Sequence, residues 1–150
     1  MVEVRCTQPG DAALLFANLR PADMAECLAY GGDVREGIEA SVRRSLLCWT
    51  AWVDGELAAI FGVAPLVMLT GMGAPWMLGT PLIGTHRRVL VGKTPEYIAQ
   101  MQRSFPHLVN FVHARNKASV RWLRRLGFTI HGAVPYGPFA EMFHPFEMRA

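Results

Sequence analysis

The sequence predicts an α/β fold in which strand-like and helix-like segments alternate along the whole chain. Short apolar runs rich in β-branched and aromatic residues indicate strands, and longer segments with apolar residues at helical spacing indicate helices. Clusters of glycine, proline and aspartate separate these segments. With 150 residues, 51% of them hydrophobic, the chain can bury a core, and we expect a single domain over residues 1–150.

The first third of the chain is expected to form one strand and three helices. Residues 2–6 alternate apolar and polar side chains, which is typical of a strand, and Pro9 and Gly10 then turn the chain. Residues 11–30 have apolar side chains at helical intervals on both sides of Pro21, which predicts two short helices or one broken helix. A further helix is expected over residues 34–45.

The middle of the chain contains the clearest hairpin signal. Asp54 and Gly55 separate two apolar runs, over 47–53 and 57–63, and this pair of residues favours a two-residue turn. Residues 74–83 predict another strand. A helix should start at Thr94, with this residue as the cap and Pro95 at the first helical position, and end at Pro106.

Residues 109–128 predict a strand, a capped helix and a glycine stop in immediate succession. Asn116 suits the N-cap of this helix, and Gly127 suits a left-handed residue at its C-terminus. The helix should have an apolar face and a basic face, formed respectively by Val120, Trp122, Leu123 and Leu126 and by Lys117, Arg121, Arg124 and Arg125. Strands over 128–133 and 139–148, joined by a turn at 135–138, should close the fold.

Asn116 and Ser119, followed by Leu126, Gly127 and Phe128, form a motif that resembles the last strand–helix–strand unit of the GNAT superfamily of acyl-CoA-dependent N-acetyltransferases. The predicted order of elements is similar to that family along the whole chain. The resemblance implies an α/β (α+β) GNAT-like fold with a mixed, mostly antiparallel, twisted sheet. This sheet would splay between strands 4 and 5 and be flanked by about four helices. The implied reaction is acetyl transfer to a small-molecule or protein amine, which attacks the thioester directly.

The resemblance also implies a cofactor, acetyl-CoA or CoA, in the splay between the strands at 74–83 and 109–114. In the family, the pyrophosphate lies on backbone amides at the start of the helix after the fourth strand, and we expect this stretch at 84–94. The family's glycine spacing is missing there, because Val91 stands at the position of the first glycine. The cofactor-binding residues expected from the resemblance are Gly79, Thr80 and Leu82 for pantetheine, Arg87, Arg88, Gly92, Lys93 and Thr94 for phosphate, and Asn116 and Ser119 on the far wall.

The sequence does not identify the catalytic residues. The family often places a tyrosine seven residues after the motif asparagine as the general acid, but this chain has Leu123 there, which cannot donate a proton. The predicted strand at 74–83 contains no aspartate, glutamate or histidine that could act as a general base. His86 and Tyr136 are the remaining candidates.

Two other functions are open. Residues 20–23 and 45–51, Trp76, Gly79 and Thr80, and the Asn116 motif together resemble small GNAT-like proteins of tailed bacteriophages, related to their internal virion proteins. This resemblance implies a catalytically silent protein that acts in virion assembly or host interaction. The basic helix face suggests nucleic-acid binding, but the net charge is only +3 and no aromatic residue is interleaved, so we expect a solvated face instead.

Composition and residue spacing exclude several other classes. Cys6, Cys27 and Cys48 are odd in number and lack metal-ligand spacing, so we expect reduced, packed thiols and no metal site. No apolar run is long enough to span a bilayer, and no signal-peptide pattern is present, so we expect a cytoplasmic protein, located in the host cytoplasm or virion if it is phage-encoded. The sequence leaves open whether the protein forms a homodimer.

Overall fold

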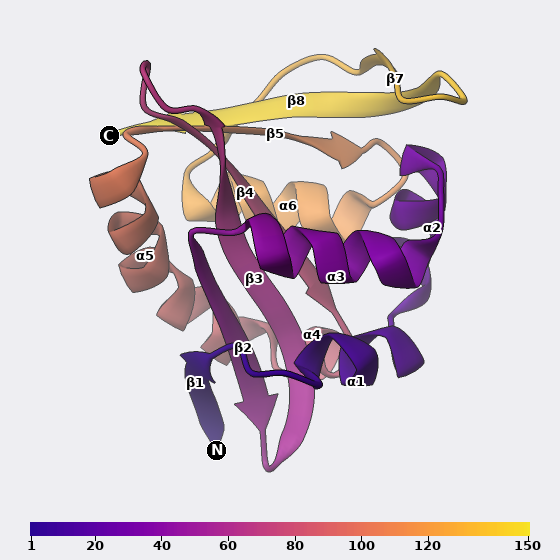
Figure 1. The fold of residues 1–150 in the computed structure, drawn as a ribbon, viewed down its shortest axis with the longest axis vertical. Helices are drawn as coiled ribbons and strands as arrows, with labels where there is room; N and C mark the ends of the chain where they lie inside the picture. The colour runs from indigo at the N-terminus through magenta and orange to yellow at the C-terminus, as the bar shows by residue number, and fades with distance from the viewer.

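The computed structural model describes residues 1–150 and contains one eight-stranded sheet with helices on both faces (Figure 1). The strand order is β1-β2-β3-β4-β5-β8-β6, and β7 pairs with β8 outside this path. All neighbouring strands are antiparallel except β4 and β5, which are parallel. The predicted mixed, mostly antiparallel sheet is thus confirmed.

The strands are β1 (Val2–Cys6), β2 (Leu47–Val53), β3 (Glu56–Val67), β4 (Met72–Gly79), β5 (His107–His113), β6 (Thr129–Ile130), β7 (Val134–Tyr136) and β8 (Glu141–Arg149). The helices are α1 (Asp11–Ala17), α2 (Pro21–Tyr30), α3 (Val34–Arg44), α4 (Leu82–Thr85), α5 (Arg87–Ser104) and α6 (Lys117–Leu126). None of these helices is long and apolar enough to cross a membrane.

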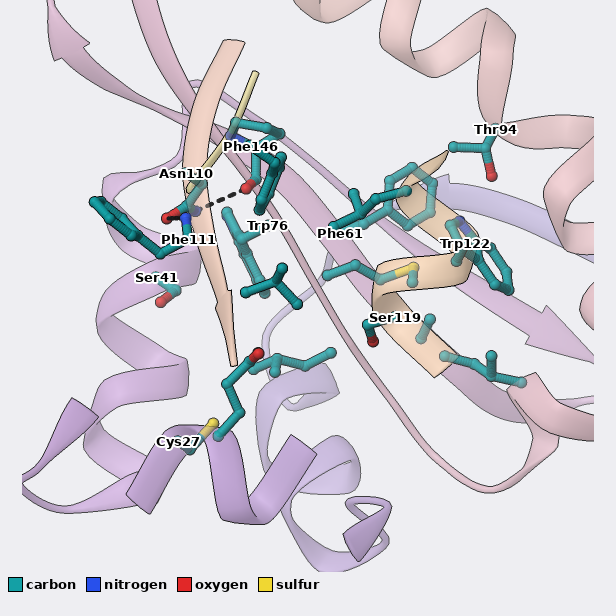
Figure 2. Close-up of a pocket in the computed structure, with 18 of the residues that line it drawn as sticks. Cys27, Ser41, Phe61, Trp76, Thr94, Asn110, Phe111, Ser119, Trp122 and Phe146 are labelled. Atoms are coloured by element: carbon teal, nitrogen blue, oxygen red, sulfur yellow. Dashed lines mark hydrogen bonds between the residues drawn. The ribbon is translucent and has the colours of Figure 1, made fainter. Parts of the chain in front are cut away.

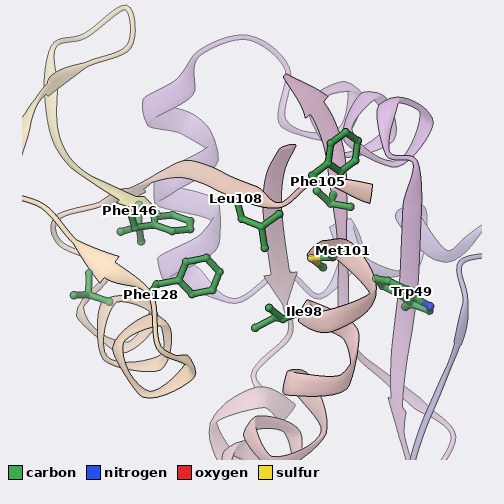
Figure 3. Close-up of a cluster of buried hydrophobic side chains, with 10 residues drawn as sticks. Trp49, Ile98, Met101, Phe105, Leu108, Phe128 and Phe146 are labelled. Atoms are coloured by element: carbon green, nitrogen blue, oxygen red, sulfur yellow. The ribbon is translucent and has the colours of Figure 1, made fainter. Parts of the chain in front are cut away.

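The two faces of the sheet are covered by different helices. Ile60 of β3 packs with Leu15 of α1 and Ile38 of α3, whereas the preceding Ala59 packs with residues of α5 and α6. This division follows from the alternation of side chains along a strand. The largest buried cluster joins α5 and α6 to the sheet (Figure 3) and contains Trp49, Val63, Ile98, Met101, Phe105, Leu108, Val112, Val120, Phe128 and Phe146.

The local signals with the most specific backbone requirements are confirmed. Asp54 and Gly55 both have positive φ, 49° and 82°, in the turn between β2 and β3. The side chain of Asn116 accepts a hydrogen bond from the backbone N–H of Ser119 at the start of α6, and Gly127 ends this helix with a φ of 101°. These residues therefore position α6 directly after β5.

The expected helix start at Thr94 is wrong, because α5 begins at Arg87 and contains Pro95 in its interior. Leu90, in the first turn, is only 6% exposed and belongs to the buried cluster with Ile83 and Trp122. Thr94 donates its hydroxyl to the carbonyl of Leu90, 2.7 Å away. Tertiary packing of the first turns outweighs the hydrogen bond that a proline cannot make.

Smaller differences lie at other element boundaries. The strand expected at 74–83 ends at Gly79, and residues 82–85 form the short helix α4. Part of the turn expected at 135–138 is strand β7, and β8 begins only at Glu141. The structure has six helices, and about four were expected to flank the sheet. Cys6 is exposed, so the expectation that all three cysteines are packed is wrong for this residue.

Replacing Gly92 with alanine should stabilise the protein. Gly92 lies inside α5, its φ is not positive, and a Cβ added there would meet no atom within 4 Å. Alanine loses less backbone entropy than glycine in a helix, so we expect a gain of roughly 0.5–1 kcal/mol. Urea unfolding of the two proteins at one pH measures this gain. A loss of stability would show that the helix does not run through residue 92.

Candidate functional site

The strands β4 and β5 pair only at their beginnings and then diverge (Figure 1). The register joins Met72 to His107 and Gly73 to Leu108, and no later residues of the two strands are paired. Beyond this point, the side-chain amide of Asn110 donates to the carbonyl of Pro75 across the opening, at 2.8 Å (Figure 2). The predicted splay is therefore present, and one side-chain hydrogen bond spans it.

A cavity of about 400 Å³ passes through the sheet at this splay. Its wall includes Trp76 and Leu78 of β4, which pack on the side of α1 and α3, and also Met77, which packs on the opposite side. Of the 33 lining residues, 23 are hydrophobic, so the passage favours an apolar ligand segment. Figure 2 shows Cys27 and Ser41 on one side of β5 and Ser119, Trp122 and Thr94 on the other. We name the two ends the α2/α3 lobe and the α5/α6 lobe.

The α2/α3 lobe contains one carboxylate with an unusual pKa, that of Glu26. Burial raises the pKa of Glu26 to about 7, although the backbone N–H of His113 donates to its Oε1 from 2.6 Å and opposes the rise. The neighbouring carboxylate of Asp23 raises this pKa further, and Arg20 lowers it. Near neutral pH, Glu26 can therefore both accept and release a proton, as a general base must.

The thiol next to Glu26 has the opposite property. Burial raises the pKa of Cys27 to about 12, and the carboxylates of Glu26 and Asp23 add to this rise. A thiol with this pKa is protonated at neutral pH and is a poor nucleophile. Although Cys27 lines the cavity, its chemistry is that of a packed thiol.

A buried polar network connects α2, β4 and α6 and reaches the cavity at Ser119. Asp23 is 1% exposed and accepts hydrogen bonds from Nε of Arg20 at 2.7 Å and from the backbone N–H of Gly79 at 2.8 Å. The side-chain amide of Asn116 also donates to it, at 3.3 Å. Nη2 of Arg20 donates in turn to the hydroxyl of Ser119, at 2.7 Å. The network thus fixes α2, the end of β4 and the start of α6 relative to one another.

The α5/α6 lobe has basic residues at its edge. Lys93 and Thr94 line the cavity from α5, and Ser119 and Leu123 line it from α6. Arg87 and Arg88 occupy the first two positions of α5, one turn before the lining residue Leu90. The first amides of a helix have no partner inside the helix and favour anions. This end of the cavity therefore suits a phosphate-bearing ligand.

The structure separates the predicted cofactor residues into four groups. Lys93, Thr94 and Ser119 line the cavity, while Arg87 and Arg88 mark the start of α5. Gly92 lies in the second turn of α5 and Leu82 lies in α4, and neither residue lines the cavity. The remaining three residues are already engaged: Gly79 donates its N–H to Asp23, Thr80 donates its N–H to the carbonyl of Ala58, and Asn116 binds Asp23.

The two candidate catalytic residues do not line the cavity. His86 occupies the N-cap position of α5 without a capping hydrogen bond from its side chain, and its Nδ1 lies 2.9 Å from the hydroxyl of Thr85. Tyr136 stacks on Phe111, a lining residue, with ring centroids 3.9 Å apart and an interplanar angle of 8°. Sequence reasoning missed Glu26, because a single glutamate in a short helix resembles an ordinary solvated position, and only the packing of β5 against α2 buries it.

The fold is that of the GNAT-family acetyltransferases, as comparison with solved structures shows. An acetyltransferase of this family from Streptococcus pneumoniae matches over 100% of both chains, with a TM-score of 0.72 and 17% identity. A ribosomal-protein-alanine N-acetyltransferase from Brucella melitensis matches over 99% of both chains, with the same TM-score and identity. Spermidine N-acetyltransferase from Vibrio cholerae, in complex with CoA and spermine, matches over 99% of this chain and 95% of its own, with a TM-score of 0.72 and 12% identity.

No protein-family model and no curated protein matches the sequence. The GNAT resemblance of the Asn116 motif is thus supported by the fold, whereas the narrower resemblance to bacteriophage proteins gains no support from these comparisons.

Proposed function

We propose that the protein is an acyl-CoA-dependent N-acyltransferase that transfers an acetyl group to an amine. The observation that supports this proposal is the cavity through the splay, because its two ends have opposite chemistry. Glu26 gives the α2/α3 lobe an acidic group, whereas Lys93, with Arg87 and Arg88 nearby, makes the α5/α6 lobe basic. An amine and a phosphate-bearing donor can therefore approach one another from opposite faces of the sheet.

The residues fit acetyl-CoA in the passage and at the start of α5. Lys93, Arg87 and Arg88 would hold phosphates, and the apolar lining between Met77 and Leu123 would surround the pantetheine chain. When bound, acetyl-CoA would supply a thioester that an amine can attack. The amides of Gly79 and Thr80 already donate within the chain, so the contacts predicted for them require these bonds to open.

Glu26 would act as the general base in the α2/α3 lobe. An amine arrives mostly as an ammonium ion, and only its neutral form has a lone pair for attack. The carboxylate of Glu26 would accept that proton, and its raised pKa keeps it close to the working pH. Ser119 accepts from Arg20, so its own hydroxyl proton is available to an acceptor in the cavity.

Acetyl-CoA should raise the melting temperature of the protein. A ligand at about one hundred times its Kd adds roughly 2.7 kcal/mol, which corresponds to roughly 5 to 10 °C for a domain of this size. Thermal melts with acetyl-CoA, free CoA and adenosine measure this shift. Mass spectrometry of an amine mixture incubated with acetyl-CoA then tests transfer itself.

A variant with Arg87→Ala and Arg88→Ala tests whether the shift in melting temperature comes from this end of the cavity. Both residues are exposed, so their loss should reduce the shift without unfolding the protein. If acetyl-CoA binds but no acetyl group is transferred, the conclusion would be reduced to a protein that binds this cofactor. The absence of any shift at millimolar acetyl-CoA would sink the proposal.

A second candidate is a catalytically silent protein with this fold, such as a bacteriophage protein of virion assembly or host interaction. Two observations favour it: most of the stretch at 84–94, where the glycine-rich loop was expected, is part of helix α5, and Leu123 lines the cavity where the family often has a tyrosine. This candidate predicts indifference to acetyl-CoA in the melting experiment.

A further inference from the structure

The wall of the α2/α3 lobe offers a ligand almost no polar group except Glu26. The indole N–H of Trp76 already donates to the hydroxyl of Ser45, at 2.7 Å, and the hydroxyl of Tyr30 donates to the carbonyl of Phe111, at 3.2 Å. The hydroxyl of Ser41 likewise donates to the carbonyl of Gly37, at 2.9 Å. These side chains therefore present mainly their apolar surfaces to the cavity.

Glu26 has spare capacity for hydrogen bonds. A carboxylate has about four acceptor sites; the backbone N–H of His113 occupies one of them, and the side-chain amide of Asn116 also interacts with the carboxylate, which leaves about two sites for a ligand. The other acidic residue of the wall, Asp33, caps α3 by accepting from the backbone N–H of Glu36, at 3.0 Å. Its side chain is exposed at the rim, so water and salt screen its attraction for a cation. The half-buried Glu26 is thus the carboxylate of this wall that is most strongly removed from water.

The apolar surface continues outside the cavity. Phe111 stacks on Tyr136, which is 38% exposed, and Tyr30 meets Tyr136 edge to face at 6.1 Å. Phe139 and Met142, in the same segment of the chain, are 65% and 45% exposed. A ligand held at Glu26 could therefore extend its body along aromatic surface without leaving apolar contact.

We propose that the acceptor is an amine with a single positive charge on an apolar or aromatic body. Its ammonium group would lie against Glu26, and its body would lie between Trp76, Tyr30 and Phe111. A polyamine would place a second ammonium group against apolar wall, where an unpaired charge is unfavourable. This inference rests on the proposed function only where it calls the amine an acceptor. The predicted binding of the amine does not depend on acyl transfer.

Isothermal titration calorimetry of the full chain without any acyl donor tests the inference. The probes are 2-phenylethylamine, its neutral analogue 2-phenylethanol, ethanolamine and spermidine. We expect 2-phenylethylamine to bind at least about tenfold more tightly than the other three. Equal or tighter binding of spermidine, or of ethanolamine, would overturn the inference.

Two variants locate the binding. Glu26→Gln should weaken 2-phenylethylamine about tenfold and leave 2-phenylethanol unchanged, because only the charged contact is lost. Glu56→Gln, which changes an exposed carboxylate at the start of β3, should change neither. An unchanged affinity in Glu26→Gln would also overturn the inference. Amine binding without acetyl transfer would sink only the proposed function, whereas transfer to spermidine with no binding of 2-phenylethylamine would sink only this inference.

Discussion

Glu26→Gln will make the protein more stable above pH 7 and, if the proposed function holds, will lower the rate of acyl transfer. The pKa of Glu26 is raised from 4.5 to about 7, with burial as the largest cause. The folded state therefore binds more protons than the unfolded state between these values, and stability falls as pH rises through this window. The shift corresponds to about 3 kcal/mol, and glutamine avoids this cost because it cannot ionise.

Urea unfolding of both proteins from pH 4 to pH 8 checks the stability change. The stability of the variant relative to wild type should rise between about pH 4.5 and pH 7 and be constant on either side. The backbone N–H of His113 keeps its acceptor, because the side-chain carbonyl of glutamine can replace the carboxylate oxygen. Glu56→Gln, at an exposed position, is the matched control and should show no such change. A difference that does not vary with pH would contradict the burial of an ionisable Glu26.

The catalytic effect of the same variant follows from the proposed function. Loss of a general base typically lowers the rate about 100- to 10,000-fold. In the wild-type protein, kcat/KM should rise as the pH increases through about 7, because Glu26 ionises there. This rising limb of the pH profile should be absent in Glu26→Gln. A variant that keeps both the rate and the limb would show that another group takes the proton. A more stable but less active protein would be an example of a site that retains an unfavourable charge for function.

Local signals in the sequence predicted some of the helix ends and turns that surround the site. The helix α6 was predicted at both ends, because Asn116 and Gly127 each satisfy a specific backbone requirement within one turn of the helix. The same holds for the turn at Asp54 and Gly55. Since these requirements concern only neighbouring residues, a single sequence is enough to recognise them.

The start of α5 shows where local signals fail. Thr94, Pro95 and Glu96 form a good helix start, yet α5 begins at Arg87, eight residues before the predicted first helical position at Pro95. What decides this is the burial of Leu90 against Ile83 and Trp122, residues that come from α4 and α6. Contacts between distant segments cannot be read from propensity, and the start of this helix was predicted too late in the chain for this reason.

The chemistry of the site was the least predictable part. Glu26 becomes unusual because folding removes its carboxylate from water, beside the backbone N–H of His113, which lies 87 residues later in the chain. Asp23 likewise meets Gly79 and Asn116, which lie far from it in sequence. The sequence showed these acidic residues on the expected helix but could not show that folding would remove them from water.

Asp23→Ala should destabilise the protein more than any exposed substitution. Asp23 is fully buried and accepts from Arg20, Gly79 and Asn116. Alanine would leave the guanidinium of Arg20, whose side chain is 14% exposed, without its counterion, and the amide of Gly79 without an acceptor. Breaking a buried ion pair from one side costs about 3–5 kcal/mol, which predicts a fall in Tm of roughly 10 °C or more.

Asp33→Ala is the matched control, because Asp33 is also an aspartate at a helix start but is exposed and accepts only one backbone N–H. It should cost about 1 kcal/mol. Arg20→Met combined with Asp23→Ala should cost less than the sum of the single changes, because the double variant leaves no buried charge unpaired. Two results would contradict a stabilising role of the network: additive free-energy costs in the double variant, or an Asp23→Ala variant as stable as Asp33→Ala. Because Asp23 joins α2 to the end of β4 and the start of α6, its loss should also loosen both lobes of the cavity, so amine binding should weaken together with stability.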